Sequence, residues 1–304
     1  MPPAIHTVLG PLAPDRLGVC DAHDHLFFRS RQLPGQELDD VAAAAAELRA
    51  FRAAGGAAVV QWSPYGTGRR ADALPDLARG TGTHIVAATG LHQAAHYDAE
   101  LLARVMPRLA EVFVTELTEA VRGTGEQPVT AGLIKVAGSF HGLDAHARHT
   151  MTAAAEAHHA TGAPIAVHHE LGTGVLDVLD LLCGRLEVAP GSVILGHLNR
   201  SPDEWVHREA AKSGAFLAFD GPSRANHATD WRMLDCVAAL VEGGFGGQVL
   251  LGGDTTTAAA RSVNGGGPGM PYLTRVLRPR LVERLGEEAA HVVFTANPAR
   301  AFAW

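Results

Sequence analysis

The sequence predicts an α/β protein in which residues 1–304 form a single domain, a (β/α)8 TIM barrel. Eight short apolar runs alternate along the chain with longer amphipathic segments. The short runs are apolar nearly throughout, which is typical of parallel strands that helices cover on their faces. Eight strand–helix units fit one closed barrel. A doubly wound open sheet is the alternative, but no GxGxxG motif follows the first run to favour it.

Each expected strand is an apolar run bounded by Gly, Pro or polar residues. In order, the strands span residues 17–25, 57–63, 84–90, 131–139, 164–168, 192–197, 215–219 and 249–253. Each expected helix is an amphipathic stretch that follows one of these strands. In order, the helices span residues 39–54, 69–79, 98–122, 144–161, 174–182, 202–213, 230–242 and 272–285. No linker, low-complexity tract or repeat divides the chain.

Composition excludes several functional classes. The formal net charge of −7 argues against a nucleic-acid partner, because proteins that bind nucleic acids carry basic surfaces. No window approaches the ~18 consecutive apolar residues of a membrane span. The N-terminus lacks the basic start and apolar core of a signal peptide, and the three cysteines are scattered as in a reduced protein. We therefore expect a cytoplasmic protein that acts on a small-molecule substrate.

Polar side chains mark the C-terminal ends of four strands, where barrel enzymes build their active sites. His23 and His25 end the first strand and point the same way, because side chains two residues apart share a face. The fifth, sixth and eighth strands end at His168-His169, His197 and Asp254. Imidazoles with a carboxylate suit zinc, manganese, cobalt or iron. A lone strand histidine is more often a core residue, and Asp254 could cap a helix, but neither explains why all of them gather at one end.

Lysine is rare in this chain. Of its 25 Lys and Arg residues only Lys135 and Lys212 are lysine. Because arginine stands at nearly every other basic position, we expect Lys135, in the apolar fourth strand, to have a role that arginine cannot fill. Burial favours the neutral amine, which can react with carbon dioxide to form a carbamate that bridges two metal ions. A snorkelling lysine or a Schiff-base lysine is the alternative, but a Schiff base would need no histidine cluster.

These motifs together resemble the phosphotriesterase family of the amidohydrolase superfamily. The resemblance covers nearly the whole chain. It is carried by His-Asp-His-Leu at residues 23–26, Gly-Leu-Ile-Lys-Val-Ala at 132–137, Pro-Ile-Ala-Val-His at 164–168, Gly-His-Leu-Asn-Arg at 196–200, Asp254, and Asn-Pro-Ala-Arg at 297–300. It implies a (β/α)8 barrel with a binuclear metal site at the C-terminal ends of its strands. A homodimer is also compatible with this resemblance.

The resemblance implies a complete set of metal ligands. They are His23, His25, Lys135, His168, His197 and Asp254. The first-strand histidines and Asp254 would bind the more buried ion, and the two later histidines the more exposed one. His168 is preferred to His169 because the family's ligand follows a proline by four residues, here Pro164. Each chain would hold two divalent ions, with zinc favoured over manganese, cobalt or iron, bridged by N6-carboxylated Lys135 and a hydroxide.

The implied activity is metal-dependent hydrolysis. The bridging hydroxide would attack a lactone or related carboxylic ester, a sugar lactone among them, and Asp254 would carry the proton to the leaving group as the catalytic residue. Hydrolysis of phosphotriesters (organophosphates) or amides at the same binuclear site is the alternative. A binding protein on a degenerate barrel would lack ligands, and none is missing here.

Two segments resemble the family branch that opens phosphorylated sugar lactones. They lie at residues 219–224 and 261–269. The side chains expected to contact substrate are His92, Tyr97, Arg224 and Arg261. Together with Arg200, the latter two could clamp an anionic group, because guanidinium binds oxyanions in a bidentate manner. The alternative is that these arginines only keep the surface soluble.

Overall fold

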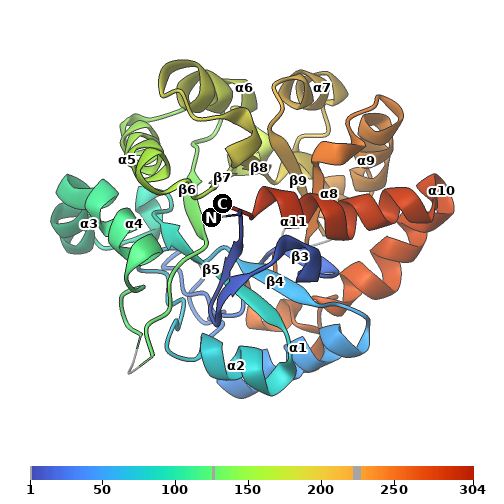
Figure 1. Cartoon of the computed structure of the whole chain (residues 1–304), viewed down its shortest axis with the longest axis horizontal. Coiled ribbons are helices and arrows are strands. Elements are labelled where there is room, and N and C mark those ends of the chain that lie inside the picture. The colour runs from blue at the N-terminus through green and yellow to red at the C-terminus, as the bar shows by residue number, and fades with distance from the viewer. Residues whose placement is uncertain (1, 125–126, 222–226) are drawn as a thin grey trace.

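The computed structural model describes residues 2–124, 127–221 and 227–304. Eight parallel strands lie side by side in the order β10-β9-β8-β7-β6-β5-β4-β3, and helices surround them (Figure 1). The strands are β3 (Cys20–Asp24), β4 (Ala58–Gln61), β5 (His84–Gly90), β6 (Leu133–Ala137), β7 (Ile165–His168), β8 (Val193–Gly196), β9 (Phe216–Asp220) and β10 (Val249–Gly252). All eight correspond to predicted strands, so the barrel prediction is confirmed.

The last and first strands meet at the mouth of the barrel. The amide of Asp254 donates to the carbonyl oxygen of His23 over 2.9 Å, and the amide of Gly253 donates to Oδ1 of Asp21 over 3.0 Å. A Cβ atom on Gly252 would lie 2.6 Å from the Cβ atom of His23, so only glycine permits this close approach. The glycines before Asp254 thus bring it against the first strand.

An antiparallel hairpin and the C-terminus cover the opposite end of the barrel. Strands β1 (Ile5–Thr7) and β2 (Gly10–Leu12) form the hairpin. The amide of Ala4 donates to the carbonyl oxygen of Trp304 over 3.1 Å, so the two termini lie together near the middle of the view in Figure 1. Ile5 is buried and belongs to the apolar cluster that fills the barrel interior. The sequence did not predict this hairpin, because its strands are too short to show a periodic pattern.

Helices pack on the outer faces of the strands. They are α1 (Val41–Ala53), α2 (Leu74–Thr81), α3 (Ala99–Val105), α4 (Leu109–Thr118), α5 (Ala145–Thr161), α6 (Val175–Leu179), α7 (Glu204–Lys212), α8 (His227–Asp230), α9 (Met233–Glu242), α10 (Arg278–His291) and α11 (Asn297–Ala301). One large apolar cluster fills the space between the strands and most of these helices. No helix in the described residues is long and apolar enough to span a membrane.

Three predicted helix boundaries are wrong. The segment 98–122 is two helices, since Pro107 lies in a 3-10 turn between α3 and α4 and proline cannot continue a helix interior. The segment 69–79 is helical only from Leu74, because Arg70 adopts a left-handed φ of 43°. The helix that corresponds to the predicted segment 272–285, α10, runs to His291 and passes through a non-helical Gly286 with φ 89°.

Candidate metal centre and active site

A cavity of about 460 Å³ opens at the C-terminal ends of the strands. All six metal ligands expected from the sequence line it: His23, His25, Lys135, His168, His197 and Asp254. Five of them are nearly inaccessible to solvent. The fold therefore brings together side chains that lie in, or one or two residues beyond, β3, β6, β7, β8 and β10. They lie up to 231 positions apart in the chain, as Asp254 and His23 do.

The two first-strand histidines are held by bonds on the outer side of their rings. His23 donates from Nδ1 to Oδ1 of Asp220 over 2.7 Å. Nδ1 of His25 lies 2.8 Å from Oγ of Ser63, and that hydroxyl donates its own proton to the carbonyl of Phe27. Both rings therefore carry the proton on Nδ1, which leaves the lone pair of each Nε2 atom toward the cavity. Burial lowers the pKa of His25 to about 4, so the ring is neutral.

His197 and Asp254 complete a compact set of donor atoms. With His23, they offer ligand atoms that all lie within 4.8 Å of one another. Nδ1 of His197 also contacts the Asp220 carboxylate. His197 and Asp254 adopt left-handed backbone conformations, with φ of 64° and 49°. Such conformations cost about 1–3 kcal/mol in residues other than glycine and concentrate at functional sites, where the surrounding fold holds them.

Asp254 lies among cationic and imidazole groups. Its Oδ1 atom lies 3.4 Å from Nε2 of His23 and 3.5 Å from Nε2 of His25. Its Oδ2 atom accepts from Nη2 of Arg200. Burial raises the pKa of Asp254, but the Arg200 guanidinium and the neighbouring imidazoles outweigh it and hold the pKa far below the usual range. The carboxylate is therefore ionised across the whole range in which an enzyme works.

Lys135 occupies the middle of β6 and is buried at 3% exposure. Its Nζ atom lies 3.1 Å from Nδ1 of His92. Burial lowers the pKa of Lys135 to about 7, against which Asp254 and Glu170 act only partly. Close to neutral pH a large share of this amine is uncharged, which is the form that can react with carbon dioxide.

His168 lies at the cavity, whereas its neighbour His169 does not. His168 lines the cavity, and its Nε2 atom lies 3.1 Å from Oε2 of Glu170, which leaves Nδ1 for a ligand. His169 is buried and its Nδ1 atom lies 3.0 Å from the carbonyl oxygen of Thr173, outside the cavity lining. The preference for His168 over its neighbour therefore agrees with the geometry.

Of the four residues expected to contact substrate, only His92 lines the cavity in the described part of the chain. His92 lines the cavity, but Tyr97 does not; its hydroxyl accepts from the amide of His92 over 2.7 Å and so supports that residue. The expected role of Arg261 as a substrate contact is corrected by the structure. Its buried guanidinium donates to the carbonyl of Leu26, and it does not line the cavity. Arg224 lies outside the described residues. Of the three arginines of the expected anion clamp, Arg200 lines the cavity.

Sequence reasoning missed three residues that orient the histidines. Asp220 contacts His23 and His197, Ser63 contacts His25, and Glu170 contacts His168. Asp220 and Ser63 each lie at or just beyond the C-terminal end of a strand, which was the available signal. Glu170 follows the fifth strand by two residues. Groups that bond the outer nitrogen of a metal-binding histidine fix its ring and its tautomer.

Most of this chain is similar to known proteins. The model of the phosphotriesterase family matches residues 3–302. A phospho-furanose lactonase of Mycoplasmopsis synoviae (strain 53) is 29% identical over 266 residues, which cover 81% of this chain and 74% of that protein. The phosphotriesterase homology protein of Escherichia coli (strain K12) is 28% identical over 293 residues, covering 95% and 99%. The crystal structure of a lactonase from Listeria monocytogenes superimposes with a TM-score of 0.89 at 27% identity, covering 98% of both chains.

Proposed function

Since this chain belongs to the phosphotriesterase family of metal-dependent hydrolases, we propose that it opens a lactone or a related carboxylic ester at a site for two divalent metal ions. One observation carries the proposal: six side chains of the types that bind such ions line a single cavity. The relatives named as lactonases, from Mycoplasmopsis synoviae and Listeria monocytogenes, favour a lactone as the substrate class.

The donor atoms fit divalent metal ions. His23, His25 and Asp254 supply two imidazoles and a carboxylate, and their neighbours leave the Nε2 lone pairs available. His168 and His197 supply imidazoles for a second ion. Imidazole and carboxylate ligands suit zinc best among the common ions, with manganese, cobalt and iron as alternatives.

Lys135 would join the two ligand groups as a carbamate. It lies on β6, next to the strand that carries His168, and its amine lies at the cavity wall beside His92. An ammonium group would repel cations, whereas a carbamate adds a negative charge and two oxygen ligands. The Schiff-base alternative is not favoured, because a Schiff base would not need the several histidines that line the same cavity as this amine.

When bound, divalent ions supply a water molecule of lowered pKa and polarise the carbonyl oxygen of the substrate. The ionised Asp254 carboxylate accepts the proton of the attacking water, because Arg200 and the imidazoles hold it in its basic form. Water adds to the carbonyl carbon, the ring C–O bond breaks, and Asp254 returns the proton to the departing ring oxygen. The product is the open hydroxy acid.

A substrate panel tests the proposed function. Metal-loaded enzyme is assayed with γ- and δ-lactones, plain and phosphorylated sugar lactones, an N-acyl amide and a phosphotriester. We expect at least one lactone to show a kcat/KM roughly tenfold or more above the amide and the triester. Asp254→Asn serves as the control for contaminating esterases. A preference for the triester or the amide that Asp254→Asn abolishes would contradict the lactonase proposal but retain the site.

A further inference from the structure

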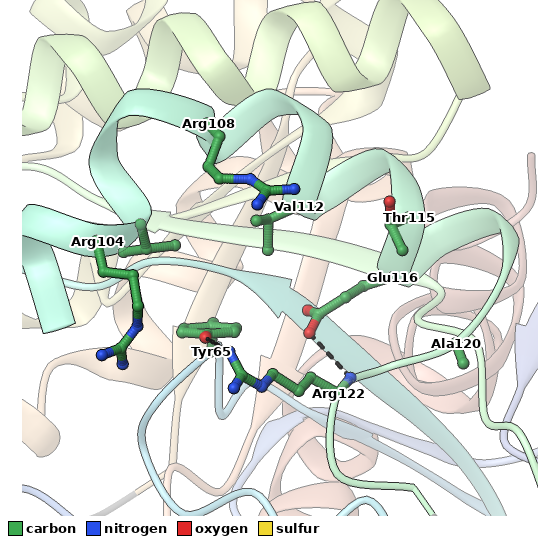
Figure 2. Close-up of a pocket in the computed structure, with 9 residues that line it drawn as sticks. Tyr65, Arg104, Arg108, Val112, Thr115, Glu116, Ala120 and Arg122 are labelled. Carbon is green, nitrogen blue, oxygen red and sulfur yellow. Dashed lines mark hydrogen bonds between the residues drawn. The ribbon is translucent and has the colours of Figure 1, made fainter.

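A second cavity, of about 340 Å³, lies outside the barrel between helices α3 and α4 and the loop after β4. None of its lining residues lines the active-site cavity. Figure 2 shows Arg104 and Arg122 on opposite sides of the Tyr65 ring, with Arg108 at the top of the view. Three arginines, spread over residues 104–122, therefore line one cavity.

The one carboxylate that lines this cavity is already neutralised. Glu116 forms a buried ion pair with Arg69, whose Nη1 atom donates to Oε2 over 2.8 Å. The same carboxylate accepts from Oγ1 of Thr89 over 2.6 Å and from the amide of Arg122 over 3.1 Å, the bond drawn in Figure 2. With its lone pairs occupied, Glu116 has little capacity to satisfy the lining arginines.

The lining guanidinium groups retain free donors. Arg104 forms no hydrogen bond or ion pair with any residue in the described part of the chain. Arg122 uses one N–H to donate from Nη1 to the hydroxyl of Tyr65 over 2.8 Å. Arg108 pairs with Glu111 at the exposed rim. Four arginines, counting Arg69, face two glutamates, so the local balance is +2 in a chain whose formal net charge is −7.

The wall between these charges is apolar. The side chains of Val105 and Val112 line it, and the ring of Tyr65 is buried at 8% exposure. The volume is at the lower end of the range for small-molecule sites, about 300–1,000 Å³. Guanidinium groups bind phosphate and carboxylate oxygens in pairs, whereas the valines and the tyrosine ring suit a small apolar body.

We propose that this cavity binds a small organic anion, a phosphate or carboxylate attached to a compact apolar group, at a site separate from the active site. Arg104 and Arg122 hold the anionic group, and the valine-lined wall receives the apolar part. The hydroxyl of Tyr65, which accepts from Arg122, still has its own proton to donate to the bound anion. The proposal does not depend on which substrate the active site hydrolyses.

Phenyl phosphate is the probe, because it combines a phosphate with a small ring. Its binding to metal-loaded enzyme is measured by calorimetry and located by hydrogen exchange of backbone amides. The pocket variant is Arg104→Gln/Arg122→Gln. The matched control is Arg280→Gln, which removes a charge from an exposed arginine of α10. Phenyl phosphate at the active site is distinguished by repeating the titration on metal-free enzyme.

We expect the wild type and Arg280→Gln to bind phenyl phosphate with protection of residues 99–122, with or without metal. The double variant should bind at this site at least tenfold more weakly, because charge-assisted hydrogen bonds are lost. Its kcat/KM should equal that of the wild type. Unchanged binding in the double variant, binding that vanishes with the metals, or no binding at roughly 10 mM probe would each overturn the proposal.

Discussion

The Nδ1 atom of His23 lies 2.7 Å from Oδ1 of Asp220, and the second oxygen of this buried carboxylate contacts His197. One carboxylate therefore orients two proposed metal ligands from different strands. Asp220→Asn keeps the shape but removes the charge, so we expect metal affinity or activity to fall about 10- to 100-fold. Chelator competition measures the affinity. Asp177→Asn, at an exposed position of α6, is the matched control, and equal loss in both variants would refute the orienting role.

Asp254→Asn tests the proton carrier. The ionised carboxylate accepts and returns the proton in the proposed reaction, so its amide should lower kcat by about 10²- to 10⁴-fold. Metal content must be measured in the same sample, because Asp254 is also a proposed ligand. A variant that retains both metal and full kcat would exclude Asp254 as the base.

Bicarbonate tests the carbamate on Lys135. Its pKa of about 7 means that the neutral amine rises from about a tenth at pH 6 to about nine tenths at pH 8. The pKa values of His25 and His168 are lowered to about 4 by burial, so these rings stay neutral throughout. When metal ions are added back to metal-free enzyme at a fixed concentration of dissolved carbon dioxide, activity should therefore return faster at pH 8 than at pH 6. Reactivation that needs no carbon dioxide would exclude the carbamate.

Glu116→Gln tests the buried ion pair beneath the second cavity. Arg69 and Glu116 are 6% and 2% exposed, and the substitution leaves the buried Arg69 charge without a counter-charge. We expect the free energy of unfolding to fall by about 3–5 kcal/mol. Denaturant titration measures this loss. The double variant Arg69→Met/Glu116→Leu should recover much of it, and a fully stable Glu116→Gln variant would contradict this role of the pair.

The strands and the proposed ligands were predictable because both depend on local patterns. Apolar runs place the strands, and parallel strands bring residues such as His197 and Asp254 to the same end of the barrel. Asp220 was not predictable as a partner of His23, because 197 positions separate the two residues and only the folded barrel brings them together. Arg261 shows the opposite failure, since a loop residue that resembles a substrate contact instead bonds the carbonyl of Leu26.

The central claim is that two divalent ions at one cavity support lactone hydrolysis. Metal-free enzyme is titrated with zinc in the presence of bicarbonate, and hydrolysis of the preferred lactone is followed after each addition. The proposed ligand sets predict that activity reaches its plateau at two ions per chain. Activity that is complete at one ion, or that persists in metal-free enzyme, would contradict it.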